Sequence, residues 1–141
     1  MTMLEIRPIK EGEFQKVLAI RKTVFIEGQK VPYEIEYDGL DDVSEHIMVI
    51  LDKKPIGCAR IRYIGKTAKL ERIAILKEYR GKGYGKELMK FLVGHAGKKA
   101  DEVTMHAQYY LLDFYKSLGF QPVGEKFSEA GIEHIKMKKI I

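Results

Sequence analysis

The chain has 141 residues, a formal net charge of +5 and a hydrophobic share of 45%. This length is typical of one domain, and the apolar share is enough to build a core. The charged residues are spread along the chain. The basic excess therefore suits an anionic ligand, but it is not by itself a signature of nucleic-acid binding. We expect one domain spanning residues 1–141.

Cysteine content and hydropathy narrow the class of protein further. The single cysteine, Cys58, excludes an intramolecular disulfide, and its strand-like surroundings predict a small core residue. No apolar run is long enough to cross a membrane, and charge at Glu5 interrupts the first apolar stretch, unlike a signal peptide. We therefore expect a cytoplasmic protein with no membrane and no nucleic-acid partner.

The first half of the chain predicts a strand, a helix and a meander. A strand is expected at residues 4–9 and a helix from 11 to about 28, where apolar residues recur at three- and four-residue steps. Residues 29–45 form an irregular segment rich in aromatic and acidic residues. Three apolar runs, at 46–51, 56–64 and 68–76, are joined by short turns and predict antiparallel strands.

The second half alternates helices and strands. Helical periodicity covers residues 84–97, and a strand is expected at 103–107. A helix at 109–118 ends at Gly119, and two strands follow at 120–127 and 132–137. The order β-α-βββ-α-β-α-ββ predicts a single α/β (α+β) domain with a mixed, mainly antiparallel central sheet flanked by helices.

The most informative stretch lies between an apolar strand and the helix at 84–97. It consists of Arg80, Gly81, Lys82, Gly83, Tyr84, Gly85 and Lys86. A helix start presents N–H groups without intrahelical partners at the positive end of its dipole, and glycines let the backbone approach a phosphate. We interpret residues 80–85 as a cradle for the pyrophosphate of a nucleotide-type cofactor, and we include Lys86, on the basic side of the helix start, in the expected cofactor-binding set. The alternative is a tight strand-to-helix connection without a ligand.

Two common phosphate motifs do not fit this cradle. A P-loop needs Gly-Lys-Ser/Thr, whereas Gly85-Lys86 is followed by Glu87. The glycines fall as G-x-G-x-G, which differs from the G-x-G-x-x-G dinucleotide fingerprint. That fingerprint also belongs to the first strand of a βαβ unit, whereas here a meander comes first.

Two spaced motifs resemble a known family. The run from Leu70 to Met89 resembles motif A of the GNAT superfamily of N-acetyltransferases, whose Arg/Gln-x-x-Gly-x-Gly/Ala pattern is carried here by Arg80, Gly83 and Gly85. The run from Tyr115 to Phe120 is similar to motif B, and the order of elements fits the same fold. Residues 21–42 resemble the ElaA/YjcF-like branch of that superfamily.

The resemblance implies a cosubstrate and a reaction. The pantetheine arm of coenzyme A would pair with the strand residues Ile73, Ala74 and Ile75, and the pyrophosphate would bind residues 80–85. Acetyl-CoA would donate an acetyl group, without a metal, to a primary amine of a small molecule or peptide by direct attack. A non-catalytic acyl-CoA-binding or regulatory module is the alternative. The acceptor, the acyl length and the oligomeric state, including a homodimer, stay open.

The resemblance also implies roles for three side chains. Tyr115 matches the position of the family's general acid, and a phenol has a suitable O–H for that role. The alternative is a buried aromatic residue that holds a hydrogen bond. Glu71 would act as base, directly or through a water, or would be an exposed strand carboxylate paired with a nearby Lys or Arg. Gln108, where many members carry Asn, belongs with Tyr115 to the expected cofactor-binding set.

Other polar residues support weaker hypotheses. His46 with Asp41 and Asp42 fits no standard metal site, and His106 is expected to be a satisfied strand histidine. The acidic segment at 33–42 either lines an acceptor pocket or is a solvated loop. Arg60 and Arg62 either meet an anionic substrate or lie on the wet side of the sheet.

Overall fold

The computed structural model describes residues 2–141. Its strands are β1 (Leu4–Pro8), β2 (Glu45–Leu51), β3 (Lys54–Ile64), β4 (Thr67–Ile75), β5 (Glu102–Gln108), β6 (Gln121–Glu129) and β7 (Ile132–Ile140). Its helices are α1 (Phe14–Arg21), α2 (Tyr33–Glu36), α3 (Tyr84–Ala96) and α4 (Leu112–Ser117). The predicted order of elements is confirmed except for the four-residue helix α2, which lies in the stretch predicted to be irregular. No helix of these residues is both long and apolar enough to span a membrane.

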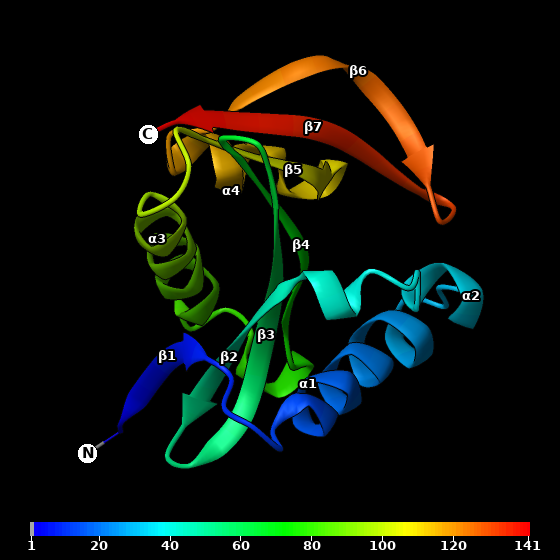
Figure 1. Ribbon diagram of the computed structural model, residues 1–141. Coiled ribbons are helices and arrows are strands. Elements are labelled where there is room, and N and C mark those ends of the chain that lie inside the picture. The colour runs from blue at the N-terminus through cyan, green and yellow to red at the C-terminus, as the bar shows by residue number, and fades with distance from the viewer. Residues whose placement is uncertain (1) are drawn as a thin grey trace.

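All seven strands form one sheet, in the order β1-β2-β3-β4-β5-β7-β6 (Figure 1). Only the β4–β5 pair is parallel, and the five other pairs are antiparallel. The predicted mixed, mainly antiparallel sheet is therefore confirmed. The long connection through α3 is what allows β4 and β5 to run in the same direction.

Helices cover the two faces of the sheet and make two cores. Leu88 and Leu92 of α3 and Tyr115 of α4 pack with buried residues of β2 to β5 and β7. On the other face, Val17 and Ile20 of α1 pack against β2, β3 and β4. Cys58 belongs to this second core, as predicted, and burial raises the pKa of its thiol to about 12.

The first helix differs in detail from its prediction. It begins at Phe14 and continues beyond Arg21 as a π-helical segment, Lys22–Gly28. Gly28 ends it, as its sequence indicated. The following irregular stretch contains the four-residue helix α2 and a short 3-10 turn, Asp41–Val43. These two pieces bring the acidic side chains of the stretch towards the sheet.

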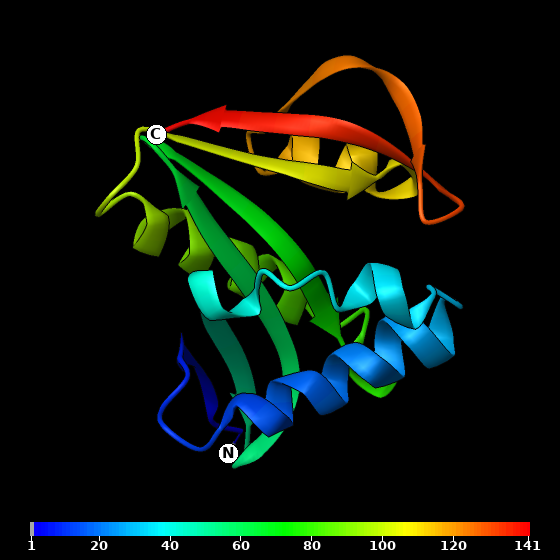
Figure 2. The same cartoon turned by 45° about the vertical axis from the view of Figure 1, so that its right-hand side comes forward.

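The two parallel strands separate soon after they meet. Residues 67–70 of β4 pair with residues 102–105 of β5, and no register follows beyond Leu70 and Met105. An irregularity then shifts β4 against β3 by one residue, and Arg72 within it has a positive φ of 55°. Such a bulge bends its strand. Figure 2 shows β4 and β5 starting from the same corner, beside the C-terminus, and diverging.

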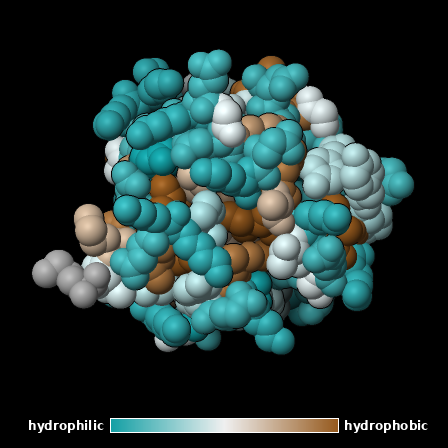
Figure 3. Space-filling view, turned by 90° about the horizontal axis from the view of Figure 1, so that it is seen from below, coloured by the Kyte–Doolittle hydropathy of each residue, from teal (hydrophilic) through white to brown (hydrophobic). Residues whose placement is uncertain are grey.

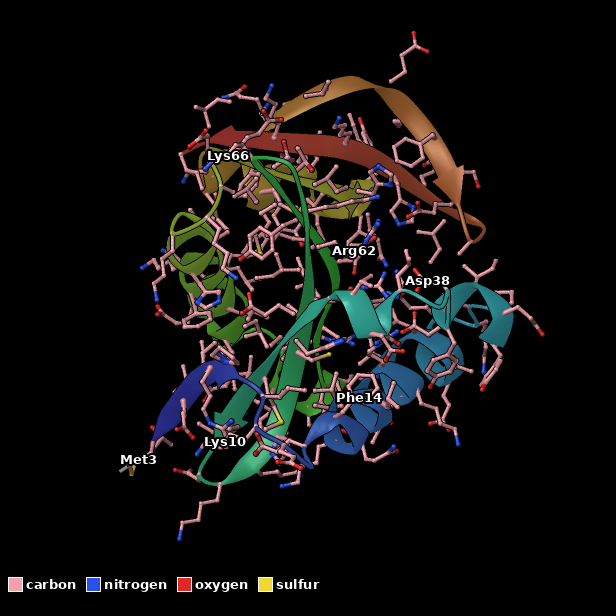
Figure 4. The ribbon with its side chains drawn as sticks, in the orientation of Figure 1. Met3, Lys10, Phe14, Asp38, Arg62 and Lys66 are labelled. Carbon is pink, nitrogen blue, oxygen red and sulfur yellow. The ribbon has the colours of Figure 1, made fainter. Side chains whose placement is uncertain are left out.

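A network of ion pairs joins the segment after α1 to the sheet. It joins four arginines to four carboxylates, Arg21, Arg60, Arg62 and Arg72 with Glu36, Asp38, Asp41 and Glu71, and Lys69 lies at its edge, 3.8 Å from Glu71. Figure 4 labels two members, Asp38 from the loop after α2 and Arg62 from β3. The side chains of Arg21 and Arg60 are 0% exposed.

This network corrects two expectations. Arg60 does not lie on the wet side of the sheet, because it is fully buried and held by Asp38, Asp41 and Glu71 at 2.8 to 3.0 Å. The segment at 33–42 is not a freely solvated loop either, because Glu36 is buried and bound by Arg21. The carboxylates of Glu36, Asp38 and Asp41 are therefore neutralised by arginines, whereas Glu34 and Asp42 are exposed.

We expect the network to make the free energy of unfolding depend on pH in the acidic range. The pKa of Asp38 lies well below its usual range, chiefly because Arg60 hydrogen-bonds it. Burial raises the pKa values of Asp41 and Glu71, but their arginine partners outweigh burial and lower them; for Glu36, burial prevails and the pKa rises. A lowered pKa in the folded state means that the unfolded chain binds more protons as the pH falls.

The stabilisation by these three carboxylates should be complete above their unfolded pKa of about 4 and should be lost progressively as the pH falls from there through their lower folded pKa values. Urea unfolding between neutral pH and about pH 3 measures this, and the free energy of unfolding should fall steeply over the acidic part of the range. A flat profile would contradict the described ion pairing.

Candidate functional site

A cleft of about 780 Å³ lies where β4 and β5 separate. Its walls come from the π-helical segment, from β4 and the start of α3, from β5 and α4, and from the β6–β7 hairpin. Much of its lining is apolar, including Phe25, Ile73, Ile75 and Met105. In the space-filling view from below, apolar surface gathers at the centre of the face, within a ring of hydrophilic residues (Figure 3).

The cradle forms one end of this cleft. Gly81 and Gly83 have φ values of 75° and 89°, in the left-handed region that favours glycine. The first turn of α3 closes with the N–H of Glu87 donating to the carbonyl of Gly83 at 3.1 Å, and no side chain caps the helix. In the described chain the N–H groups of residues 84–86 have no protein acceptor, so they are available to an anion.

The cradle also carries unpaired positive charge. No carboxylate of residues 2–141 forms an ion pair with Arg80, Lys82 or Lys86. Nε of Arg80 donates to the carbonyl of Ile75 at 2.8 Å, which fixes the guanidinium beside the end of β4. Lys82 lies over the ring of Tyr79 and is the one expected cofactor residue outside the cleft lining. Backbone donors and the cations of Arg80 and Lys86 therefore converge where a pyrophosphate was predicted, and Lys82 adds a third positive charge just outside the lining.

The strand that leads to the cradle has a free edge. The N–H of Leu76 donates to Ile56, and the carbonyl of Ala74 faces Gly57 on β3. Because main-chain groups alternate in direction along a strand, those of Ile73 and Ile75 face away from β3, into the cleft, where the Ile75 carbonyl already accepts one hydrogen bond from Arg80. An extended ligand can pair with this edge as an added strand. The carbonyl of Ala74 faces β3, so Ala74 does not offer it to the ligand and contributes only apolar lining.

Tyr115 and Gln108 lie on the opposite wall. The Tyr115 side chain is buried, and its hydroxyl has no hydrogen-bond partner within the described residues. Burial, and to a smaller extent Tyr110, raises its pKa to about 12. Gln108 exchanges two amide hydrogen bonds with Gln29, at 2.9 and 3.2 Å, which tie the end of β5 to the π-helical segment.

Glu71 lies in the cleft wall within the ion-pair network. Arg62 donates to its two oxygens at 2.6 and 3.1 Å, and Arg60 donates at 3.0 Å. Of the two interpretations that the sequence offers, the geometry favours the paired carboxylate. Its closest partners are arginines on β3, and its side chain is only 11% exposed, so the carboxylate is not the exposed one that was expected. A carboxylate with a lowered pKa is a weak proton acceptor.

A third polar group lies on the wall made by β5, β6 and β7. His106 is bound to Glu129 at 3.0 Å, as expected of a satisfied strand histidine, and His134 lies 3.6 Å from the other Glu129 oxygen. Glu129, His134 and Gln29 line the cleft but had no sequence signal, because their partners are distant along the chain. In residues 2–141, no three His, Cys, Asp or Glu side chains form a candidate metal site.

Comparisons with known proteins agree with this arrangement. The model of the acetyltransferase (GNAT) domain family matches residues 23–141. Among relatives from Bacillus subtilis (strain 168), the uncharacterised protein YyaT is 40% identical over 135 residues, and the uncharacterised N-acetyltransferase YjcF is 39% identical over 131. The alignment with YyaT covers 93% of this chain and 91% of YyaT, and the alignment with YjcF covers 92% of this chain and 94% of YjcF. Protein ElaA of Escherichia coli is 33% identical over 134 residues, with 91% and 88% covered.

Solved structures share the fold over nearly the whole chain. A putative N-acetyltransferase from Lactobacillus plantarum superposes with a TM-score of 0.90 at 22% identity, covering 97% of both chains. A GNAT family acetyltransferase from Elizabethkingia anophelis, with acetyl-CoA bound, has a TM-score of 0.75 at 17% identity and covers 98% of both chains. The family match and the relatives together confirm the resemblance drawn from the two motifs, and the chain belongs to the GNAT acetyltransferase family.

Proposed function

We propose that this protein transfers an acetyl group from acetyl-CoA to a primary amine by direct attack of the amine on the thioester. The observation that carries the proposal is the free edge of β4, which leads directly to a cradle with unused N–H groups and unpaired cations. Membership of the family and the acetyl-CoA bound to a structural neighbour support it. We propose that residues 1–141 act as one cytoplasmic domain.

The cradle fits coenzyme A by its donor set. The pyrophosphate would accept from the free N–H groups of the first turn of α3, beside Arg80, Lys82 and Lys86. The pantetheine arm would pair with the main chain of Ile73 and Ile75, which places the thioester near the bulge at Arg72. Gln108 and Tyr115 face this path from the other wall.

Tyr115 is the residue to which we assign the general acid. Its free O–H can donate to the leaving sulfur. Burial raises its pKa to about 12, so the phenol keeps its proton until the leaving thiolate forms beside it.

Replacing Gly83 with Val should abolish the binding of acetyl-CoA. The side chain would enter the cradle, and the positive φ of 89° would strain the turn that aims the N–H groups. Isothermal titration with acetyl-CoA measures the effect. Gly124→Val is the matched control, because Gly124 also has a positive φ of 78° and open space around it but lies on β6 outside the cleft lining. Equal binding by both variants would remove the cradle's role.

Tyr115→Phe should spare acetyl-CoA binding and slow the transfer by about 10²-fold or more, because only the proton donor is lost. Thiol release from acetyl-CoA with a panel of primary amines measures turnover. Tyr63→Phe is the matched control: the pKa of Tyr63 is also raised to about 12, but it bonds Glu45 away from the cleft. Unchanged turnover of Tyr115→Phe would remove its acid role. Binding without turnover in the wild type would favour the regulatory module.

Glu71→Gln separates the two interpretations of that residue. As a network member, its loss should lower the free energy of unfolding by about 1–3 kcal/mol, because Arg60 and Arg62 each lose a partner. Turnover per folded molecule should then change little. A loss of about 10²-fold in turnover at unchanged stability would instead identify Glu71 as the base. Urea unfolding and the thiol-release assay are measured on the same preparation.

A further inference from the structure

The cleft wall opposite Glu71 carries a cluster of titratable side chains from three strands. Nδ1 of His106 on β5 lies 3.0 Å from Oε1 of Glu129, at the end of β6. Nε2 of His134 on β7 lies 3.6 Å from Oε2 of the same glutamate. The ring of Phe127 packs edge-on against His106 at 5.0 Å and stacks with His134 at 6.0 Å. Contacts with Glu129 and Phe127 therefore hold both histidine rings in place.

Glu129 differs from every other carboxylate that lines the cleft. Glu36, Asp38 and Glu71 are each bound by at least one arginine. Glu129 has no ion pair with Lys or Arg within the described residues, and its side chain is 47% exposed. An incoming ammonium therefore meets neutralised charge on the β3–β4 side and one carboxylate without a permanent cation on this side.

The hydrogen bonds define which nitrogen of His106 is free. A carboxylate can only accept, so Nδ1 of His106 donates to Glu129 and Nε2 of the neutral ring carries the lone pair. Nδ1 of His134 donates to the carbonyl of Ile132 at 2.7 Å, which fixes that ring instead to the hairpin. Of the two histidines of this cluster, only His106 therefore combines a close carboxylate on one nitrogen with a free acceptor on the other.

We propose that His106 is the base that receives the proton of the acceptor ammonium, and that Glu129 is a positioning residue that orients His106 and attracts the cation. The inference rests on the proposed acetyl transfer. The other charged groups near His106 are His134, Lys136, which is its register partner on β7, and Glu71, which follows the last β4–β5 pair. The acceptor class is thus a primary amine that is a cation at neutral pH.

The proton balance closes with groups already described. The ammonium gives one proton to Nε2 of His106, and the neutral amine attacks the thioester carbon. The C–N bond forms, the C–S bond breaks, and the thiolate takes the proton of Tyr115. The second proton that the nitrogen loses as the amide forms returns to Tyr115 through water. His106 then releases its proton to solvent, so one proton is released per acetyl transferred.

The test compares two series of probe amines of matched size: alkylamines, which are cations at neutral pH, and O-alkylhydroxylamines, which are neutral there. His106→Gln should lower kcat/KM for alkylamines by about 10²-fold or more, while O-alkylhydroxylamines, which need no deprotonation before attack, stay nearly unchanged. Glu129→Gln should show the same selective loss to a smaller extent, since its amide oxygen can still accept from Nδ1. Acetyl-CoA binding by calorimetry should be intact in both variants.

His95→Gln is the matched control, because His95 also pairs with a glutamate, Glu45, at 2.9 Å but lies outside the cleft lining. It should leave both amine series unchanged. Equal losses for both series in His106→Gln, or no loss in either, would overturn the base assignment while leaving the transfer reaction in place. A wild-type protein that neither binds acetyl-CoA nor acetylates either series would overturn the proposed function itself, and this inference with it.

Discussion

The site depends on one strained residue, Arg72, and on the carboxylates that hold it. A positive φ in a residue with a long side chain costs on the order of 1–2 kcal/mol, and here it creates the bulge that bends β4 away from β5. The Arg72 guanidinium lies 2.9 Å from Glu36 and 3.3 Å from Asp38, and it also donates to two carbonyls of α2. The segment after α1 thereby keeps the two parallel strands apart.

The separation of these strands creates both the space and the donors of the site. A β4 that continued beside β5 would satisfy the main chain of Ile73 and Ile75 within the sheet. The bend leaves that edge free, and the same strand then ends at the turn that starts α3. A bound thioester and its pyrophosphate would therefore be aligned by one continuous piece of backbone, from the bulge to Lys86.

Charge is distributed along the cleft according to burial. Arg21 and Arg60 are fully buried, and each is bound by at least two carboxylates, because an unpaired buried cation is costly. Arg80, Lys82 and Lys86 lie at the surface of the cradle, where an unpaired charge costs little and remains available to an anion. Glu129 is likewise exposed and has no Lys or Arg partner within the described residues, and it lies where we propose that the acceptor amine binds. The net charge of +5 says nothing of this division.

The sequence predicted the elements and the cradle because their signals are local. Periodicity defined the strands and helices, and the turn at residues 80–86 needs only neighbouring glycines and cations. The ion-pair network could not be predicted, because it joins residues that are far apart in the sequence, from Arg21 to Arg72. Arg60 and Arg62 also alternate along β3, which is the pattern of a strand face exposed to solvent, although Arg60 is buried. The same holds for Gln29 with Gln108 and for His106 with Glu129 and His134, which depend on strand order and register.

The central claim, that coenzyme A lies along β4 and ends in the cradle, is tested most directly by two-dimensional ¹H–¹⁵N spectra of the protein titrated with acetyl-CoA. The account predicts that the amide signals of Ile73, Ile75 and residues 81–86 shift most, with smaller changes on β1 and β2. Absence of shifts at saturating acetyl-CoA, or shifts confined to residues outside the cleft, would contradict it.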